Sequence, residues 1–127
     1  MASILRVNTL TDASSNNSVP MATVNQGTAK FWVKWNGTGT VATSDSFNSS
    51  GITDNGTGLT TFGFSTNMGN VNYSLATTNS SVEANNSQTN FHTATTSTIK
   101  METRSGTAAD LLTDTTQNFG QINGDSA

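Results

Sequence analysis

The stretch Ala29–Gly39, which reads AKFWVKWNGTG, constrains the fold more than any other part of the sequence. Its apolar residues recur at every second position, which is the period of a β-strand with one buried face. An Asn-Gly pair follows, and this dipeptide is a strong hairpin signal because both residues tolerate the positive φ of a type I′ turn. The buried face is expected to carry Phe31, Val33 and Trp35, and the opposite face Lys30, Trp32 and Lys34.

Short alternating runs separated by turn formers continue through the rest of the chain. A second Asn-Gly pair, Asn55-Gly56, predicts another hairpin. We expect the segment Ile52–Leu75 to form an antiparallel meander of three strands around it. Strands are expected at Ser3–Leu10, Val19–Asn25, Val41–Thr43, Asp45–Ile52, Leu59–Ser65, Val71–Ala76, Phe91–Thr98, Ile99–Arg104 and Thr115–Ile122.

This pattern predicts an all-β protein, an antiparallel sandwich or small barrel of about eight short strands. The one helical signal is a turn at Ala109–Leu112, and Thr77–Asn90 reads as a long polar loop or a strand exposed on both faces. We expect an N-terminal strand and connecting segment at residues 1–28, followed by a β-sandwich or knob domain at residues 29–127.

The composition points to a thin apolar core. Of 127 residues, 24 are Thr, 16 Ser and 16 Asn, whereas Leu, Ile, Val and Phe together number 23. Thr suits strands and Asn, Gly and Ser suit turns, so a β-protein with a hydroxyl- and amide-rich surface fits this balance better than disorder does. Small domains already bury a limited share of their surface. We therefore expect identical chains to complete one another's cores.

Several classes of protein are disfavoured. The chain has no cysteine, which leaves no disulfide framework or thiolate metal site. The N-terminus shows no signal-peptide pattern, and no apolar run is long enough to cross a bilayer, so we expect no membrane insertion. Five Lys and Arg residues against eight acids argue against nucleic-acid binding, which depends on basic patches.

Catalytic signals are weak. His92 is the one histidine, and no spacing pairs it with an orienting carboxylate and a nucleophile. The segment Asp54–Gly58 has some likeness to a calcium loop but lacks the acidic residue that closes such a loop, and a hairpin explains it better. We expect no enzymatic activity, no cofactor and no metal. The acids considered for a glycosidase pair are Asp45, Asp54, Glu83, Asp110 and Asp114, and no cluster of aromatic residues accompanies them.

Trp32 is unusual because a large aromatic residue stands between two lysines on the wettable face of its strand. The interpretation we favour is that a neighbouring chain or loop covers it, which makes Trp32 a candidate for the oligomer interface. The alternative is a platform for a sugar ring, since aromatic side chains offer large contact area with a polar handle.

The order of several motifs resembles the distal β-domain of tail-fibre proteins of tailed bacteriophages, particularly marine and cyanobacterial ones. The resemblance lies in AKFWVKWNGTG, SFNSSGITDNGTGLTTFGFSTNMGNVNYSLA and STIKMETRSGTAAD, and spans about Ile4–Asp110. It implies an intertwined homotrimer on the virion surface, at a tail fibre or tail tip, that attaches to a host glycan or envelope protein. The candidate receptor contacts are the loop residues Asn67, Asn70, Asn85 and Asn86.

One departure from that group keeps a second function open. Fibres of this kind usually carry a long N-terminal shaft, and this sequence begins close to the distal domain. The chain is therefore expected to be either a tail-tip module held by other virion proteins or a capsid decoration (cement) protein on the capsid exterior with no receptor role.

Overall fold

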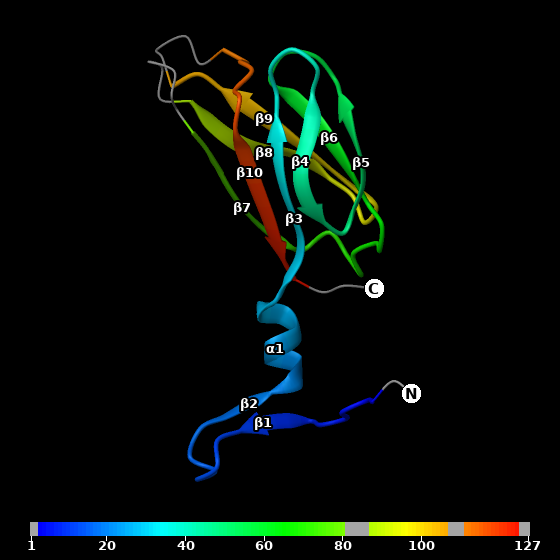
Figure 1. The fold of residues 1–127 in the computed structure, drawn as a ribbon, viewed down its shortest axis with the longest axis vertical. Helices are drawn as coiled ribbons and strands as arrows, with labels where there is room; N and C mark the ends of the chain where they lie inside the picture. The colour runs from blue at the N-terminus through cyan, green and yellow to red at the C-terminus, as the bar shows by residue number, and fades with distance from the viewer. Residues whose placement is uncertain (1–2, 81–86, 107–110, 125–127) are drawn as a thin grey trace.

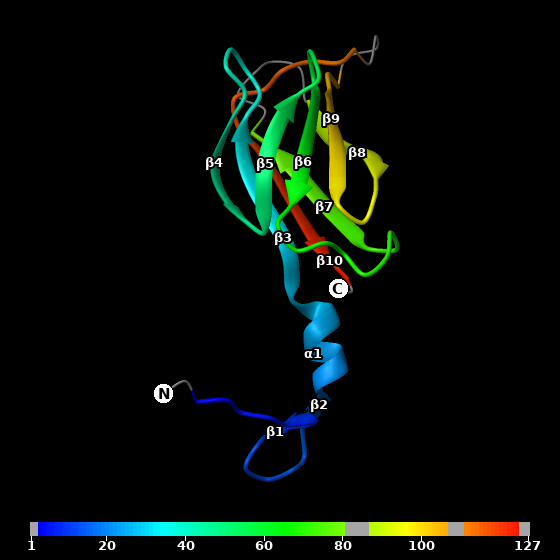
Figure 2. The same cartoon turned by 90° about the vertical axis from the view of Figure 1, so that its right-hand side faces the viewer.

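The computed structural model describes residues 3–80, 87–106 and 111–124, which form ten strands and one short helix. Two four-stranded antiparallel sheets, in the orders β4-β3-β10-β7 and β5-β6-β9-β8, face each other, and neither closes into a barrel (Figures 1 and 2). The protein is thus an all-β sandwich. Its strands are β3 (Ala29–Asn36), β4 (Ala42–Phe47), β5 (Ser49–Asp54), β6 (Leu59–Phe64), β7 (Ser74–Asn79), β8 (Gln88–Ala94), β9 (Thr98–Arg104) and β10 (Asn118–Asn123).

The predicted central strand is confirmed. β3 alternates between buried and half-buried residues along its length, with Phe31, Val33 and Trp35 no more than 2% exposed. Its inner face packs edge-on against aromatic rings of β6, with 4.9 Å between the ring centroids of Trp35 and Phe62. The apolar core consists of Phe31, Val33, Trp35, Phe62, Phe64, Met68, Ile99, Met101 and Ile122.

The buried residues of this core all come from one chain, and the expectation that identical chains complete one another's cores stays a prediction. The interior closes because buried polar residues add to the apolar ones: Asn118 is 1% exposed and Thr115 is 2% exposed. Buried polar groups are tolerated when they hydrogen-bond to one another, as these two do. Buried polar residues therefore supplement the apolar core, and the homotrimer remains a prediction.

The predicted meander is wrong in its third strand. β5 and β6 form the expected hairpin, but β7 leaves their sheet and pairs with β10 of the other sheet. The connection at residues 65–73 makes this crossing because Met68 is 2% exposed and its backbone N–H donates to the carbonyl of Thr96 at 2.8 Å. The buried side chain of Met68 therefore fixes the middle of this connection to the core.

The single strand predicted at Asp45–Ile52 is also wrong. Asn48, with φ 59°, ends β4 and turns the chain directly into β5 of the opposite sheet. The first Asn-Gly pair stands where β3 ends and the connection to β4 begins, and the second lies in the β5–β6 connection. Neither connection is a type I′ turn at its Asn-Gly pair. Positive φ occurs at Gly39, Gly56 and Gly58 rather than at either asparagine of the pairs.

The N-terminal region differs most from the prediction. The strand expected at Ser3–Leu10 is reduced to β1 (Thr9–Thr11), which pairs with β2 (Ser18–Pro20). The strand expected at Val19–Asn25 is replaced by a helix, α1 (Met21–Gly27). Pro20 occupies the N-cap position with φ −58°. Proline is tolerated at the start of a helix because the first N–H groups have no partner inside the helix.

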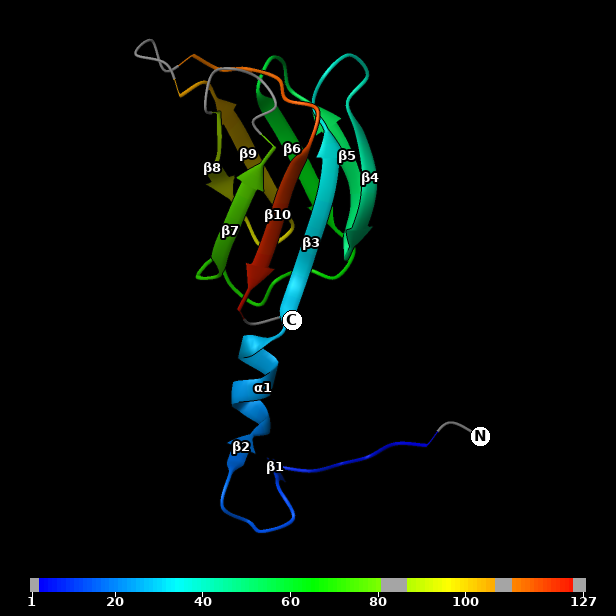
Figure 3. The same cartoon turned by 60° about the vertical axis from the view of Figure 1, so that its left-hand side comes forward.

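We refer to residues 3–28 as the N-terminal arm. The arm extends from one end of the sandwich, with α1 nearest the sandwich and the β1-β2 hairpin beyond it (Figures 1 and 3). Its attachment includes a hydrogen bond of 2.9 Å from Asn123 Nδ2 to the carbonyl of Gly27. Residues 3–20 are all exposed and α1 buries none of its residues. None of the helices in the described ranges has the length and apolar character needed to cross a membrane.

Of the remaining predictions, the helical turn at Ala109–Leu112 falls half outside the described residues, and Leu112 instead forms a β-bridge with Arg104. The segment Thr77–Asn90 is not a continuous loop, because its first residues belong to β7 and its last ones to β8.

Candidate functional site

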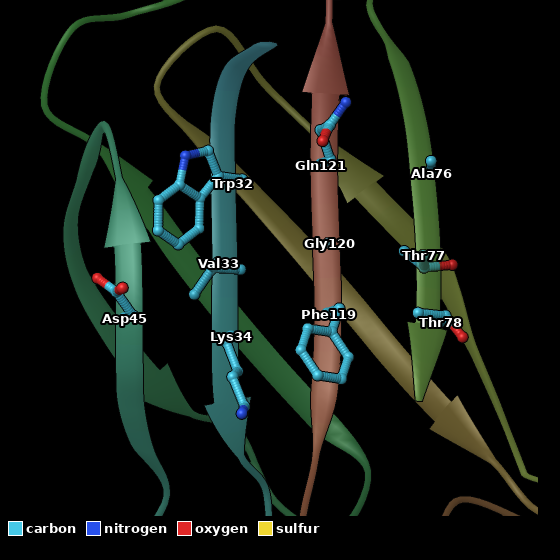
Figure 4. Close-up of a pocket in the computed structure, with 10 residues that line it drawn as sticks. All are labelled: Trp32, Val33, Lys34, Asp45, Ala76, Thr77, Thr78, Phe119, Gly120 and Gln121. Carbon is cyan, nitrogen blue, oxygen red and sulfur yellow. The ribbon is translucent and has the colours of Figure 1, made fainter. Parts of the chain in front are cut away.

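A groove of about 470 Å³ runs over the outer face of the β4-β3-β10-β7 sheet. Trp32 and Phe119 supply its aromatic surface, and Lys34, Asp45 and Gln121 supply polar and charged groups (Figure 4). We call these five residues and the space above them the outer groove. Its floor and far side are completed by Val33, Ala76, Thr77, Thr78 and Gly120.

Strand register brings the five residues together. In the antiparallel pairing of β3 with β10, Trp32 lies opposite Gln121 and Lys34 lies opposite Phe119. On the other side of β3, Lys34 lies opposite Asp45 of β4. Because directly opposed residues project from the same face of a sheet, all five side chains share the outer surface. Their positions alternate with the core residues, so the packing of the interior also fixes the outer groove.

The two charged residues have different surroundings. Lys34 Nζ stands 5.3 Å from the ring centroid of Phe119, a cation–π contact that holds the ammonium over the groove. The exposed Asp45 carboxylate accepts a hydrogen bond of 2.8 Å from the backbone N–H of Ser46 through Oδ1. The positive charge of Lys34 offsets the negative charge of Asp45, so the outer groove carries no net charge.

Trp32 is half-buried within its own chain, and its role as an oligomer-interface residue stays a prediction. Phe47, its register partner on β4, is 52% exposed, so aromatic surface continues beyond the groove toward the edge of the sheet. Gln121 is exposed, its Nε2 donates to Asn123 Oδ1 at 3.1 Å, and its side-chain carbonyl is a further acceptor group. The outer groove therefore offers two rings, an ammonium, a carboxylate and an amide on one surface.

Sequence reasoning singled out Trp32 but missed its partners. The predicted strand Thr115–Ile122 contains Phe119 and Ile122, and an interval of three residues places these two on opposite faces. Ile122 is fully buried and Phe119 is half-buried on the outer side. Applying the period of two from Ile122 through Gly120 to Asn118 would have placed Phe119 outside.

The predicted receptor contacts are not gathered at one site. Asn67 is exposed, and Asn70 is half-buried with its Oδ1 accepting the backbone N–H of Asn72 at 2.7 Å. Both lie in the β6–β7 connection, at the end of the sandwich from which the arm leaves (Figure 1). Asn85 and Asn86 lie outside the described residues, so these four contacts remain predictions.

Of the titratable groups considered for catalysis, Glu83 and Asp110 lie outside the described residues. His92 is exposed, with Nδ1 2.8 Å from the hydroxyl of Thr93. Asp54 and Asp114 each accept a backbone N–H of the β5–β6 turn, from Gly56 and Gly58 respectively. Among residues 3–80, 87–106 and 111–124, no three His, Asp or Glu side chains come together as a metal site would require. Burial raises the pKa of Tyr73, whose hydroxyl donates to the carbonyl of Thr95 at 3.0 Å.

Comparison with known proteins gave no matching family model, no matching curated protein and no matching solved structure.

Proposed function

We propose that this chain is a non-enzymatic structural protein of a bacteriophage virion, a tail-fibre-like module that attaches to a receptor on the host surface. The observation that carries the proposal is the contrast between the two parts of the molecule. The sandwich closes its own core, whereas the arm exposes nearly all of its apolar side chains. A module that is held by other chains at one end and displayed at the other has this organisation.

The arm supports the part of the proposal that concerns assembly. Leu5 is 82% exposed and Ile4 is 74% exposed, while Leu10 and Val19 lie opposite each other in the hairpin and are 45% and 42% exposed. An isolated two-stranded hairpin and a seven-residue helix are each marginal in water. Partner chains that cover these side chains would stabilise both elements. We propose that the partners are two further copies, giving the homotrimer that the resemblance to tail fibres implies, docked on other virion proteins.

The sandwich supports the part that concerns attachment. Its outer surface is rich in hydroxyl and amide groups, and the outer groove adds aromatic surface with hydrogen-bonding groups beside it. Short polar side chains form hydrogen bonds at small entropic cost. Three copies on one particle would raise the avidity of a weak individual contact without any new contact.

Two measurements on the intact virion test this proposal. Antibody fragments raised against the full chain and visualised by electron microscopy are expected to label the tail tip or tail fibres. The same fragments, or an excess of the free protein, are expected to reduce adsorption of the phage to its host. Fragments against an unrelated capsid protein serve as the control. Label confined to the head, with unchanged adsorption, would instead indicate a capsid decoration protein.

A further inference from the structure

We propose that the outer groove binds a neutral sugar ring of a surface glycan, which stacks on Trp32 and Phe119 and hydrogen-bonds to Lys34, Asp45 and Gln121. This inference rests on the proposed attachment function and identifies its ligand class and its site.

The two aromatic residues of the outer groove lie on neighbouring strands of one face. Trp32 and Phe119 occupy diagonal positions on neighbouring strands, because Gln121 is opposite Trp32 and Phe119 lies two residues before Gln121. Diagonal positions in an antiparallel pair are about 7–8 Å apart, close enough for one ligand to contact both residues. The C–H groups on one face of a pyranose are apolar and pack against aromatic faces. Trp32 and Phe119 are only half-buried on this outer face, so part of each ring is accessible to a ligand.

The polar groups around the platform match the edge of a sugar. Hydroxyl groups both donate and accept, and the outer groove supplies an ammonium donor, a carboxylate acceptor and an amide acceptor. Within the described part of the chain, Lys34 has the ring of Phe119 as its one recorded partner, so its protons remain available. Charge-assisted hydrogen bonds of this kind are stronger than neutral ones.

Charge and geometry favour a neutral glycan over other occupants. The cation and the anion of the outer groove stand opposite each other, whereas a nucleic acid or an anionic polysaccharide would call for net positive charge. A second copy of this chain would have to bury Lys34 and Asp45 among aromatic rings, and interface cores are depleted of charged residues. A bound sugar leaves both groups partly hydrated. The volume of about 470 Å³ lies within the range of small-molecule sites.

The two tryptophans give the experiment an internal reference. Trp35 is 1% exposed, whereas Trp32 is half-buried at the groove. Acrylamide is expected to quench the fluorescence of Trp32 and to leave that of Trp35 nearly unchanged. The variant Trp32→Phe keeps an aromatic side chain, removes the quenchable signal and so assigns it.

The full-length protein is first screened on an array of neutral and anionic oligosaccharides, and the glycans retained are titrated during acrylamide quenching. At least one neutral glycan is expected to bind and to protect Trp32, with quenching of Trp32 about twofold weaker when half the sites are filled. Phe119→Ala is expected to weaken binding roughly 2- to 10-fold through loss of one aromatic contact. Asp45→Ala, at an exposed position, tests the polar rim without touching the platform. Phe91→Ala on β8 of the other sheet is the matched control and should bind normally.

Three outcomes would overturn the inference. They are the absence of any neutral glycan that protects Trp32, a Trp32 already shielded from acrylamide in the free protein because a second copy covers it, and unchanged binding by both Phe119→Ala and Asp45→Ala. Virion labelling and adsorption are measured independently. If the tail is labelled and adsorption is blocked while no glycan protects Trp32, this inference fails and the proposed attachment function stands.

Discussion

At the scale of single residues, the interior of the sandwich is built partly from amide and hydroxyl groups. Asn118 Oδ1 lies 3.1 Å from Thr89 Oγ1 and 3.4 Å from Thr103 Oγ1, and it also accepts the hydroxyl of Thr115. Asn118 Nδ2 donates to the carbonyl of Thr115 at 3.0 Å. Because Asn118 lies on β10 while Thr89 and Thr103 lie on β8 and β9, these bonds join the two sheets.

Replacing the central amide should therefore be costly. We expect Asn118→Ala to lower the free energy of unfolding by about 1–3 kcal/mol, since it leaves buried hydroxyl groups without their acceptor. Urea unfolding followed by tryptophan fluorescence measures the change. Gln117→Ala, at the exposed neighbouring position, is the control and should change stability by less than about 0.5 kcal/mol. Equal effects of the two substitutions would show that the buried network contributes little.

The sequence predicted the apolar half of this interior but not the polar half. Phe31, Val33 and Trp35 stand out because they alternate with lysines and a tryptophan along one strand. Thr103 belongs to a similar alternation, but a threonine suits either face of a strand. Asn118 lies within the predicted strand Thr115–Ile122, but an asparagine in a strand is more typical of the solvent-facing side than of the interior. Burial of such residues depends on partners more than ten residues away, which no local pattern contains.

At the scale of elements, the prediction succeeds where alternation is long and fails where one residue redirects the chain. β3 and β9 each alternate over seven residues or more and were located correctly. Asn48 ends β4 because its side chain binds both layers: Nδ2 donates to the carbonyls of Lys30 and Thr66 at 2.9 Å each. Oδ1 also accepts the backbone N–H of Thr66 at 2.6 Å. Lys30 and Thr66 are each eighteen residues from Asn48, so a local sequence pattern does not predict that the strand ends here.

In the β1-β2 hairpin, the side chain of Asp12 stabilises the turn in a similar way. The Asp12 carboxylate accepts the backbone N–H of Asn16 at 3.0 Å through Oδ1 and the side-chain amide of Asn17 at 2.7 Å through Oδ2. The hydrogen bond from the Asn17 side chain, followed by that from the Asn16 backbone, holds the pKa of Asp12 below its ordinary value of 3.8. Hydrogen bonds to the ionised form have this effect because protonation removes an acceptor.

The hairpin turn should therefore loosen in acid. A carboxyl whose pKa is lower when folded stabilises the folded form above the ordinary value of 3.8, and this contribution is lost as the pH falls through the lower folded pKa. We expect the amide resonance of Asn16 to move toward its unstructured position over that acidic range, as followed by NMR. In Asp12→Asn the same resonance should show no such titration. A wild-type resonance that stays constant throughout would contradict this role of Asp12.

At the scale of the whole molecule, the sandwich is stabilised by its own core, whereas the arm has no core of its own. The sandwich contains its own core, including T-shaped aromatic pairs such as Phe31–Phe64 at 5.2 Å between ring centroids. The arm is fixed to it near Gly27, where Lys30 Nζ also donates to Asn25 Oδ1 at 2.6 Å, but its apolar side chains face solvent. The proposed trimer is therefore expected to depend on the arm, whereas folding of the sandwich is not.

This separation predicts the behaviour of a paired substitution in the hairpin. Leu10 and Val19 lie opposite each other, and we expect Leu10→Ser with Val19→Ser to convert the trimer to monomers because it removes the apolar surface that the copies would share. Light scattering coupled to size-exclusion chromatography measures the mass, and circular dichroism should show that the sandwich stays folded. Leu111→Ser makes the same type of change at a residue of the sandwich that is 63% exposed, and it should leave the mass unchanged. A wild-type protein that is monomeric, or a double variant that keeps the trimer mass, would remove the arm from the assembly and with it the main support for a displayed, particle-bound module.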